Sequence, residues 1–459
     1  KVQPARPDNI PEWNDIAGKS VGEPIIYNSA VAIAFYDIYP EIYNTIMPKI
    51  LGPMAEILKT YSANGCLTDA GFAYSRESYA YYVAVMFQRL GYDIYGDQTK
   101  LGYKMIYSRT PHGAMVRQGD DHSHANYVIG THATSRETIA LGLLGTLSED
   151  PYLWYQYAKE YAGKKDLSAL LYFVNDADSK LPDDLPLANF VEEPRSEIIA
   201  RTSWKMGLDA PAAMAYMNMN NRRTGDHDHS DIGQFQLYYK GPLTMPAGSY
   251  VGEGWGDSHW LNYYSRSISN NTMSVYDPDE VFISCNNDTA EANDGGQRMA
   301  RGKNGGLVSD AEHLTDYNLW SKVEGSYIGP NEKTPAFSYL KGDLTTAYNS
   351  NKMESYKRGM VFMDTFNKTY PGVMIVFDRV VSKNPAFRKA WNLQAVTEPQ
   401  IIGNKITIIN TEDGCNGKLV NTTLLPQNAE ITKVGGVGKY VVGDKEYPAD
   451  SETTASASY

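Results

Sequence analysis

Cysteine, long hydrophobic runs and an excess of positive charge are all missing from this sequence. The three cysteines, Cys66, Cys285 and Cys415, lie far apart and match no zinc-binding or CxxC spacing, so the sequence predicts no disulfide framework. No run of about 18 apolar residues occurs, which excludes a membrane-spanning helix. There are 42 Lys and Arg residues against 54 Asp and Glu, and the net charge of −12 disfavours non-specific nucleic-acid binding.

The start of the chain has no sign of a signal peptide. Neither an apolar segment nor a cleavage site follows Lys1-Val2-Gln3-Pro4. From this we expect either an intracellular chain or a mature, trimmed one.

The composition is that of a folded protein. Of the 459 residues, 42% are hydrophobic and 12% aromatic, which excludes a disordered chain, and 39 glycines are too few for a collagen-like repeat. The length predicts two or three domains. Tyrosine outnumbers phenylalanine by 35 to 12. Tyrosine rings both stack and donate hydrogen bonds, as in sugar-binding clefts and on many all-β surfaces.

Helical patterns fill the first third of the sequence. Residues 29–50 carry apolar side chains at helical spacing, with a break or kink expected at Pro40. Residues 78–90 are apolar almost all round, as in a helix packed within a helical array. Residues 135–147 and 151–161 continue the series. This pattern predicts a helical bundle or an α/α toroid rather than alternating strands and helices.

The period changes to that of strands after a segment rich in proline and acidic residues, 181–194, which we interpret as a linker. Strands are predicted at 234–239, 373–381 and 405–409, and a hairpin at 439–447 turning at Gly443-Asp444. The predicted fold class is therefore α+β with segregated domains. We expect a helical domain at 1–180, a central β domain at 195–390 and a C-terminal β segment at 391–459.

The densest polar segment, residues 218–231, reads NMNNRRTGDHDHSD. His227 and His229 lie two residues apart, so their side chains point to the same side of an extended chain. A solvated loop is the alternative, but the preceding arginines and the following strand favour a site. A second cluster, DDHSH at 120–124, is interpreted as an exposed loop. On its own, Tyr79 would be a core residue with a satisfied hydroxyl.

Several segments, in one consistent order, resemble a known family. Residues 224–241 (TGDHDHSDIGQFQLYYKG) and 262–280 (NYYSRSISNNTMSVYDPDE) are similar to two blocks of the heparinase II/III-like polysaccharide lyases, and closest to heparinase II. Residues 32–43 and 70–79 resemble helices of the family's α/α toroid, and residues 201–204 the strand that opens its β-sandwich. The resemblance implies an incomplete N-terminal toroid, an antiparallel β-sandwich and further C-terminal β structure. It also implies that the first toroid helices are missing from this chain.

The resemblance implies a reaction as well. The family cleaves uronate-containing polysaccharides by β-elimination and leaves 4,5-unsaturated uronate ends. A tyrosine and a histidine at the domain junction move the protons, and the matching positions here are Tyr79 and His227. Their functional atoms are expected to lie within roughly 10 Å of each other, because both must reach one sugar ring.

Neutralising the uronate carboxylate requires donors or cations nearby. The family places a His or Asn before its kinked helix, followed by Glu, whereas this chain has Lys19 and Glu23 in that region. Arg222 and Arg223, which precede the His-x-His motif, are the alternative. Asp226 is also assigned to substrate binding. For Lys19 an ordinary surface lysine remains the other interpretation.

The chemistry requires no cofactor, although the family carries zinc. His229 matches a zinc ligand of the family, but the usual partner positions read Pro246 and Asn270, with His259 nearby in sequence. A proline side chain cannot ligate zinc, and an amide is a poor substitute for imidazole. We therefore predict hydrogen bonds rather than a metal at His229, and absent or weak zinc binding.

Three functions remain open. A lyase acting on heparin or heparan sulfate is the first, a lyase on another uronate polymer such as alginate the second, and a catalytically silent glycan-binding relative the third. The expected partner is an acidic polysaccharide, with no nucleic acid and no membrane span, and a homodimer is open. The family resemblance implies a periplasmic or secreted location.

Overall fold

The computed structural model describes most of the chain. The described residues are 24–67, 78–120, 135–161, 179–220, 222–223, 227–250, 254–302, 305, 319–436, 439–449 and 459.

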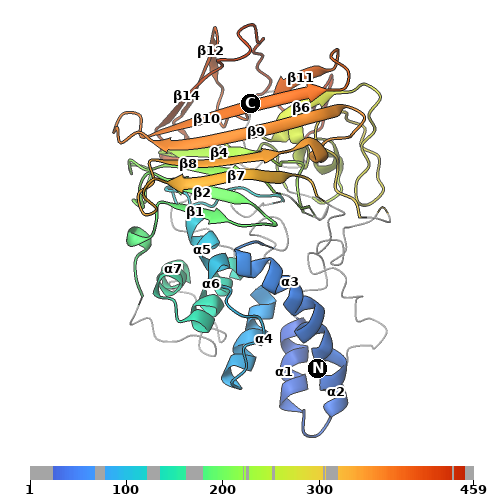
Figure 1. Ribbon diagram of the computed structural model, residues 1–459, viewed down its shortest axis with the longest axis vertical. Helices are drawn as coiled ribbons and strands as arrows, with labels where there is room; N and C mark the ends of the chain where they lie inside the picture. Colours follow the sequence, from blue (N-terminus) through green and yellow to red (C-terminus); the bar gives the residue numbers. More distant parts are fainter. Residues whose placement is uncertain are drawn as a thin grey trace.

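The first part of the chain is helical and forms the lower half of the molecule in Figure 1. Its helices are α1 (Pro24–Ala34), α2 (Pro40–Lys49), α3 (Ala55–Thr60), α4 (Ser78–Arg89), α5 (Thr99–Tyr107), α6 (Ser135–Ser148) and α7 (Pro151–Tyr161). Pro40 occupies the first turn of α2, where its missing N–H has no helical partner to lose. The chain therefore breaks at Pro40, as the sequence predicts.

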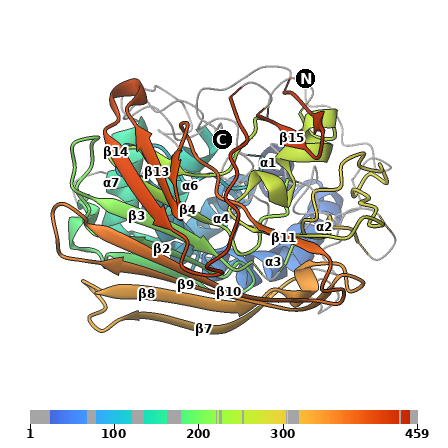
Figure 2. The ribbon, with the colours of Figure 1, turned by 90° about the horizontal axis from the view of Figure 1, so that it is seen from above.

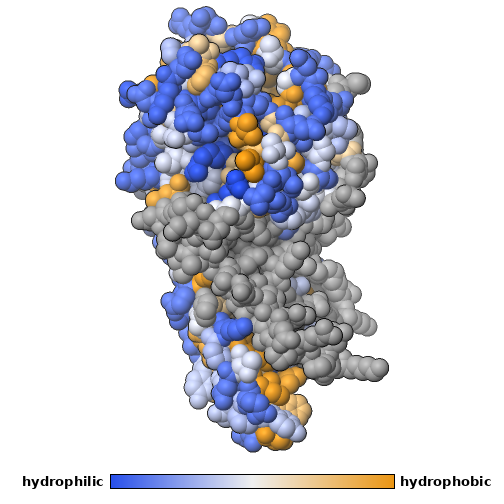
Figure 3. Space-filling model, turned by 90° about the vertical axis from the view of Figure 1, so that its right-hand side faces the viewer, coloured by the Kyte–Doolittle hydropathy of each residue, from blue (hydrophilic) through white to orange (hydrophobic). Residues whose placement is uncertain are grey.

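Two hydrophobic clusters hold the helices together. One joins α4 to α5, α6 and α7 and extends to the first sheet through Ile199 and Tyr216. The other joins α1, α2 and α3 to α4. At the far end of this half, Phe35, Tyr36 and Tyr39 in and beside the α1–α2 turn are about half exposed. Figure 3 shows hydrophobic side chains gathered there.

Two antiparallel sheets follow the helices. The first has the order β1-β2-β3-β4-β5, with β1 (Ala188–Val191), β2 (Glu197–Arg201), β3 (Ala213–Asn218), β4 (Phe235–Tyr239) and β5 (Pro242–Thr244). The second has the order β10-β9-β8-β7, with β7 (Lys322–Gly329), β8 (Phe337–Asp343), β9 (Met353–Asp364) and β10 (Gly372–Ser382). Figure 2 shows them as adjacent layers, and one buried cluster contains residues of both.

Smaller β elements complete the chain. β6 (Met273–Tyr276) pairs with β11 (Arg388–Trp391), and β12 (Gln400–Ile402), β13 (Lys405–Asn410) and β14 (Gly417–Thr422) form a three-stranded sheet. β15 (Val441–Val442) and β16 (Lys445–Glu446) form a hairpin. Its turn contains Gly443 at a φ of 63°, a conformation that glycine adopts without strain.

The α+β class is confirmed, because helices precede antiparallel sheets. The expectation of a linker at 181–194 is wrong in its second half, where β1 pairs with β2 and places Ala188 opposite Ala200. Ala188 and Val191 are buried, so four residues between prolines and acidic groups suffice for an edge strand. The toroid and the domain boundaries remain predictions.

Candidate functional site

The His-x-His segment lies between β3 and β4 of the first sheet. After it, the chain returns to the sheet through a turn in which Gly233 has a φ of 86° and its N–H bonds to the carbonyl of Asn218 at 3.1 Å. A side-chain carbon at Gly233 would lie 2.6 Å from a methyl group of Leu344. Both the conformation and the close contact therefore require glycine, and the turn fixes where the histidines lie.

Both histidines bond to one buried carboxylate, that of Asp120. Nδ1 of His227 lies 2.9 Å from one oxygen of Asp120, and Nε2 of His229 lies 2.8 Å from the other. The indole Nε1 of Trp260 donates to the carboxylate at 2.7 Å. Asp120 is fully buried, so these N–H groups replace the water that it loses on folding.

With an ionised Asp120, this arrangement determines which nitrogen of each ring carries the proton. An indole N–H can only donate, which makes Oδ1 of Asp120 an acceptor, and when Asp120 is ionised its other oxygen also accepts from every donor around it. His227 then carries its proton on Nδ1, and in the neutral ring its Nε2 has the lone pair of a general base. His229 carries its proton on Nε2. The geometry is that of a histidine oriented by a carboxylate.

Both histidines are buried, and their rings have different neighbours. His229 is buried, and its ring lies edge-on to Tyr264 with centroids 4.5 Å apart. Burial holds the pKa of His229 well below its usual value, and the nearby Arg117 and Arg223 guanidinium groups lower the pKa further. His229 is thus neutral at physiological pH and acts as a structural hydrogen-bond donor, while His227 is the member of the pair beside the aromatic rings described below.

The segment that carries Asp120 is fixed to the sheet by Gln236 of β4. The backbone N–H of Arg117 donates to the Gln236 side chain at 3.0 Å, and that side chain donates to the Arg117 carbonyl at 2.5 Å. The Arg117 guanidinium donates to the carbonyls of Pro246 and Gly248 at 3.2 Å each. The buried side-chain amide of Gln236 therefore holds in place the segment that carries the Asp120 carboxylate.

Asp228, the residue between the two histidines, is also bound on both sides. Arg195, in the β1–β2 turn, donates to its two carboxylate oxygens at 2.6 and 3.2 Å, a bidentate pair buried from solvent. Arg223 donates to the Asp228 carbonyl at 3.4 Å and to the Arg298 carbonyl at 3.0 Å. These contacts hold the segment at its centre and leave its histidines in a fixed orientation.

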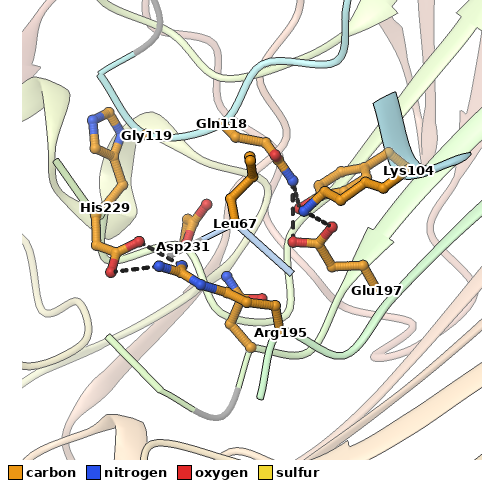
Figure 4. A pocket seen from close by; sticks show the side chains of 11 residues that line it. Leu67, Lys104, Gln118, Gly119, Arg195, Glu197, His229 and Asp231 are labelled. Atoms are coloured by element: carbon orange, nitrogen blue, oxygen red, sulfur yellow. Dashed lines mark hydrogen bonds and ion pairs between the residues drawn. The ribbon is translucent and has the colours of Figure 1, made fainter. Parts of the chain in front are cut away.

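A narrow polar cavity lies beside Asp228 and His229 (Figure 4). At its far side Lys104 and Glu197 form a buried ion pair at 2.8 Å, and Gln118 donates to Glu197 at 3.1 Å. Burial raises the pKa of Asp231, which also lines the cavity, to about 6. The lysine of this cavity is neutralised by the protein's own carboxylate, so it is not arranged to receive an acidic sugar.

Aromatic rings flank His227. The ring of Tyr250 is perpendicular to the imidazole with centroids 6.1 Å apart, and the ring of Trp255 lies at 6.5 Å. Trp255 in turn lies 6.0 Å from Trp260, the indole that donates to Asp120. Aromatic side chains with a polar edge stack on sugars while donating hydrogen bonds, so these rings suit a carbohydrate site.

The structure brings only some of the predicted residues together. Tyr79, near the start of α4, is half-buried against the cluster that joins α1, α2 and α3 to α4. Tyr61 is another tyrosine of the helical half. Burial raises the pKa of its hydroxyl, and the nearby guanidinium groups of Arg195 and Arg222 offset part of that increase. Lys19, Glu23 and Asp226 lie outside the described residues. The pairing of Tyr79 with His227 stays a prediction.

Arg222 and Arg223 differ in their surroundings. Arg222 is half-buried, whereas Arg223 is buried, with its guanidinium 5.0 Å from the ring of Trp320, and burial lowers its pKa to about 10. Because the donors of Arg223 bind backbone carbonyls, this residue fits a structural role better than the predicted contact with substrate.

The residues predicted around zinc do not fit that metal. Nε2 of His229 is bonded to Asp120, and the side-chain amide of Asn270 donates to the Arg266 carbonyl at 3.0 Å. His259 donates from Nδ1 to the Tyr447 carbonyl at 2.6 Å and accepts from the Ser249 N–H at 3.2 Å, so both ring nitrogens are used. Among the described residues no group of three or more His, Cys, Asp or Glu is placed to hold a metal ion.

The sequence analysis missed Asp120 and Trp260, and the expectation of an exposed loop is wrong at Asp120, which is buried. Residues 121–124 of that cluster lie outside the described part of the chain. One signal was available: a histidine that acts in a site generally donates its second N–H to a carboxylate or carbonyl, so His227 needed an acceptor. Asp120 is an acceptor of the right type, but its position in the sequence does not show that it lies close to His227.

Comparisons with known proteins give a structural similarity but no match in sequence. No protein-family model matches the chain, and no curated protein matches it. A solved structure described as a heparinase III gene product with methylated lysines is similar, with 16% sequence identity and a TM-score of 0.49. The match covers 86% of this chain and 50% of that structure, so the chain spans half of its length. The closer resemblance to heparinase II expected from the sequence motifs stays a prediction.

The described helices are short relative to a lipid bilayer or too polar for it. None of them is both long enough and apolar enough to cross a membrane.

Proposed function

We propose that this protein is a polysaccharide lyase that cleaves uronate-containing acidic polysaccharide by β-elimination, with an α/α toroid stacked on a β-sandwich. The observation that carries the proposal is the contact between Asp120 and His227. A buried carboxylate 2.9 Å from Nδ1 leaves the lone pair on Nε2, which is the form that a proton-transferring histidine needs. The ordered sequence motifs supply the reaction class.

The reaction makes three demands on the site. The C5 proton of a uronate is weakly acidic, so the adjacent carboxylate must be neutralised before the proton can leave. A base must then accept that proton, and an acid must protonate the leaving glycosidic oxygen. We assign these proton transfers to His227 and Tyr79, with Tyr250 and Trp255 stacking against the sugar. Asp120 stabilises the imidazolium form of His227 when that ring gains a proton.

The neutralising group is assigned to Arg222 or Lys19. Arg222 adjoins the His-x-His segment and is not fully buried, in contrast to Arg223. A guanidinium binds a carboxylate in a bidentate manner, which would both neutralise the uronate and orient it. Glu23 and Asp226 are assigned to hydrogen bonds with sugar hydroxyls. No metal is assigned a role, because the zinc positions of the family are occupied by groups bonded within the protein.

The substrate class follows from charge. Heparin or heparan sulfate is the leading candidate, and the net charge of −12 makes a less sulfated polymer such as alginate the main alternative. Such substrates are met outside the cytoplasm, so we propose a periplasmic or secreted location.

The test is a panel of purified polysaccharides: heparin, heparan sulfate, chondroitin sulfate, hyaluronan and alginate. Each is incubated with the protein, and the ultraviolet absorbance of the conjugated double bond in the product is followed. The proposal predicts an increase with at least one polymer, and abolition of that increase in a His227→Gln variant. A Tyr92→Phe variant, which changes an exposed tyrosine beyond α4, serves as the matched control and should keep full activity.

Each outcome decides between the functions. Activity on heparin or heparan sulfate supports the leading substrate, and activity only on another polymer supports the alternative. No activity on any member, combined with retained polysaccharide binding, would overturn the lyase proposal in favour of a glycan-binding protein.

A further inference from the structure

The outer face of the sheet β10-β9-β8-β7 contains two glycines in one row across the strands. Phe377 of β10 pairs with Gly359 of β9. On its other side Gly359 pairs with Lys341 of β8, which in turn pairs with Gly325 of β7. The row faces away from the first sheet, because the preceding residue of β8, the buried Leu340, belongs to the core that the two sheets share. Figure 2 shows the sheet as the outermost layer on this side of the molecule. We call these four paired positions the glycine row.

The aromatic ring of Tyr339, two residues before Lys341 on β8, lies between the two glycines. A side-chain carbon at Gly325 would lie 3.7 Å from Cε1 of this ring, and one at Gly359 would lie 3.8 Å from Cε2, at the opposite edge. Apart from the residues adjacent to each glycine, no other heavy atom of the described chain comes within 4 Å of either position. Tyr339 itself is partly exposed. Because the glycines place no side chain against the edges of the ring, a ligand can approach it from both sides.

Three more aromatic rings lie on the same face. Tyr327 of β7 pairs with Tyr339 and is 48% exposed, and its ring lies 5.3 Å from that of Phe337. Phe377, at the β10 end of the glycine row, is 63% exposed. None of these rings belongs to a hydrophobic core cluster of the described residues. Exposed aromatic clusters mark binding surfaces, and tyrosine rings suit ligands that offer both an apolar face and hydrogen-bonding groups.

The part of this face next to the glycine row has an excess of positive charge. Glu324 binds both Lys341 and Lys357, and Asp343 lies 3.8 Å from Lys357. The charged side chains at the outward positions of this part are Lys322, Lys341, Lys357, Arg379, Glu324 and Asp343. Four cations against two anions leave a surplus of two positive charges, in a chain whose net charge is −12. Such a local surplus favours an anionic ligand.

The row beside the glycine row, which we call the charged row, begins and ends with a cation. It leads from Arg379 of β10 through Lys357 and Asp343 to Lys322 of β7. Neither Arg379 nor Lys322 forms an ion pair with another residue that the structure describes. Arg379 follows Phe377 by two positions, so its side chain projects from the same face beside that ring. A guanidinium binds a carboxylate through two parallel N–H groups, and those of Arg379 are available to a ligand.

We propose that this face is a second carbohydrate-binding site, in which a chain of uronate sugars crosses the strands along the glycine row. Tyr339 and Phe377 stack against the sugar rings, and Arg379 binds their carboxylate groups. The face lies on the side of its sheet turned away from β3 and β4, whose connection carries His227, so it holds the polymer without cutting it. The proposal goes beyond the lyase function and does not depend on it, because binding at this face requires no proton transfer.

Other partners fit the face less well. A nucleic-acid strand carries a charge about every 3.4 Å, whereas the face offers a surplus of two cations over the roughly 14 Å that three strand spacings span. The same comparison favours a polymer of moderate charge, such as alginate, over a heavily sulfated one. A second copy of the chain would bring the same positive surplus and would be repelled.

The test is isothermal titration calorimetry of an alginate oligosaccharide with the His227→Gln variant as the parent protein, so that the ligand is not cut. A Gly325→Thr/Gly359→Thr variant of this parent fills the glycine row without removing a ring or a charge. It should bind one oligosaccharide fewer per chain, because the new side chains stand against the edges of Tyr339. Neither glycine has a left-handed backbone conformation and threonine is favourable in strands, so the melting temperature should not change.

A second variant of the parent, Tyr339→Ala/Arg379→Ala, removes the ring and the unpaired cation and should lose the same binding event. Its matched control is Tyr370→Ala/Lys368→Ala in the β9–β10 turn, which also removes an exposed tyrosine and one positive charge. The control should bind as many oligosaccharides as the parent. A neutral dextran oligosaccharide should not bind at this face, because it offers no carboxylate to Arg379.

Three results would overturn the proposal: no binding of the alginate oligosaccharide by the parent protein, unchanged binding in either variant of the face, or the same loss in the control. Binding of oligothymidylate in place of alginate, abolished by the two variants of the face, would assign the face to a nucleic acid instead. A failure of the lyase function is distinguishable, since it removes cleavage by the wild type and leaves the binding event at this face.

Discussion

The carboxylate of Asp120 lies 2.9 Å from Nδ1 of His227, although 107 positions separate the two residues in the chain. The contact joins the segment that follows α5 to the connection between β3 and β4. It sets the ring orientation and the protonation of the one histidine to which we assign a proton transfer. Several expectations about activity and stability depend on this contact and on its neighbours.

The first concerns Asp120 itself. In Asp120→Asn the amide has a single acceptor oxygen, so it cannot accept from His227, His229 and Trp260 together, and its NH₂ favours the wrong tautomer of His227. We expect kcat to fall by about 10³–10⁴-fold with a smaller change in KM. The measurement is steady-state kinetics on the best substrate of the panel.

Asp294→Asn is the matched control for that variant. Asp294 is equally buried, and its partner is Arg266 rather than a histidine. It should melt at a lower temperature while losing little kcat per folded molecule. Equal losses of kcat in the two variants would show that Asp120 has only a structural role.

A second expectation separates two tyrosines of the helical half. If Tyr79 transfers a proton, Tyr79→Phe should lower kcat by about 10²–10⁴-fold without a large change in stability. Tyr61→Phe removes a buried hydroxyl near Arg195 and should chiefly change the melting temperature. The reverse pattern, with activity lost in Tyr61→Phe and kept in Tyr79→Phe, would move the assignment to Tyr61.

A third expectation follows from Asp231, whose pKa burial raises from 3.8 to about 6 against the opposing effect of Arg223. Between these values the folded protein keeps a proton that the unfolded chain releases, so the free energy of unfolding falls as the pH rises. The full effect is about 3 kcal/mol between pH of about 4 and 6. Urea denaturation of wild type and Asp231→Asn across this range measures it.

The Asn variant cannot titrate at this position, so its stability should decline less over that interval than that of the wild type. Superimposable pH profiles of the two proteins would show that Asp231 does not titrate in this way.

The metal expectation can be settled by elemental analysis. Because Nε2 of His229 and both ring nitrogens of His259 are bonded within the protein, the dialysed protein should contain far less than one zinc per chain, and chelation should leave any lyase activity unchanged. Near-stoichiometric zinc that survives dialysis and disappears in His229→Ala would contradict this expectation.

The parts of the fold that the sequence predicts are those with strong local patterns. Residues 78–90 are apolar almost all round, and 78–89 of them form α4, while the run at 373–381 forms most of β10. β1 was not predicted, because its four residues, which lie between prolines and acidic residues, are too few to show the alternating pattern of a strand. β1 is stabilised by its pairing with β2, and the amino acids of β1 alone do not reveal that pairing.

The candidate site was predictable only in part for a similar reason. The spacing of His227 and His229 shows that they share a side, but not what lies on that side. Their acceptor, Asp120, comes from a segment that reaches them only because Gln236 bonds to the backbone of Arg117. A contact over more than a hundred positions depends on the packing of the sheet against the helical half, which a single sequence does not specify.

The most direct test of the central claim is the chemistry of the newly cut ends. The wild type is incubated in ¹⁸O-labelled water with the most reactive polymer, and the products are weighed by mass spectrometry. Elimination predicts ends lighter by one water than hydrolysis products, with no heavy oxygen incorporated, and no such products from His227→Gln. Hydrated ends that carry ¹⁸O, or unsaturated ends that persist in His227→Gln, would contradict the account.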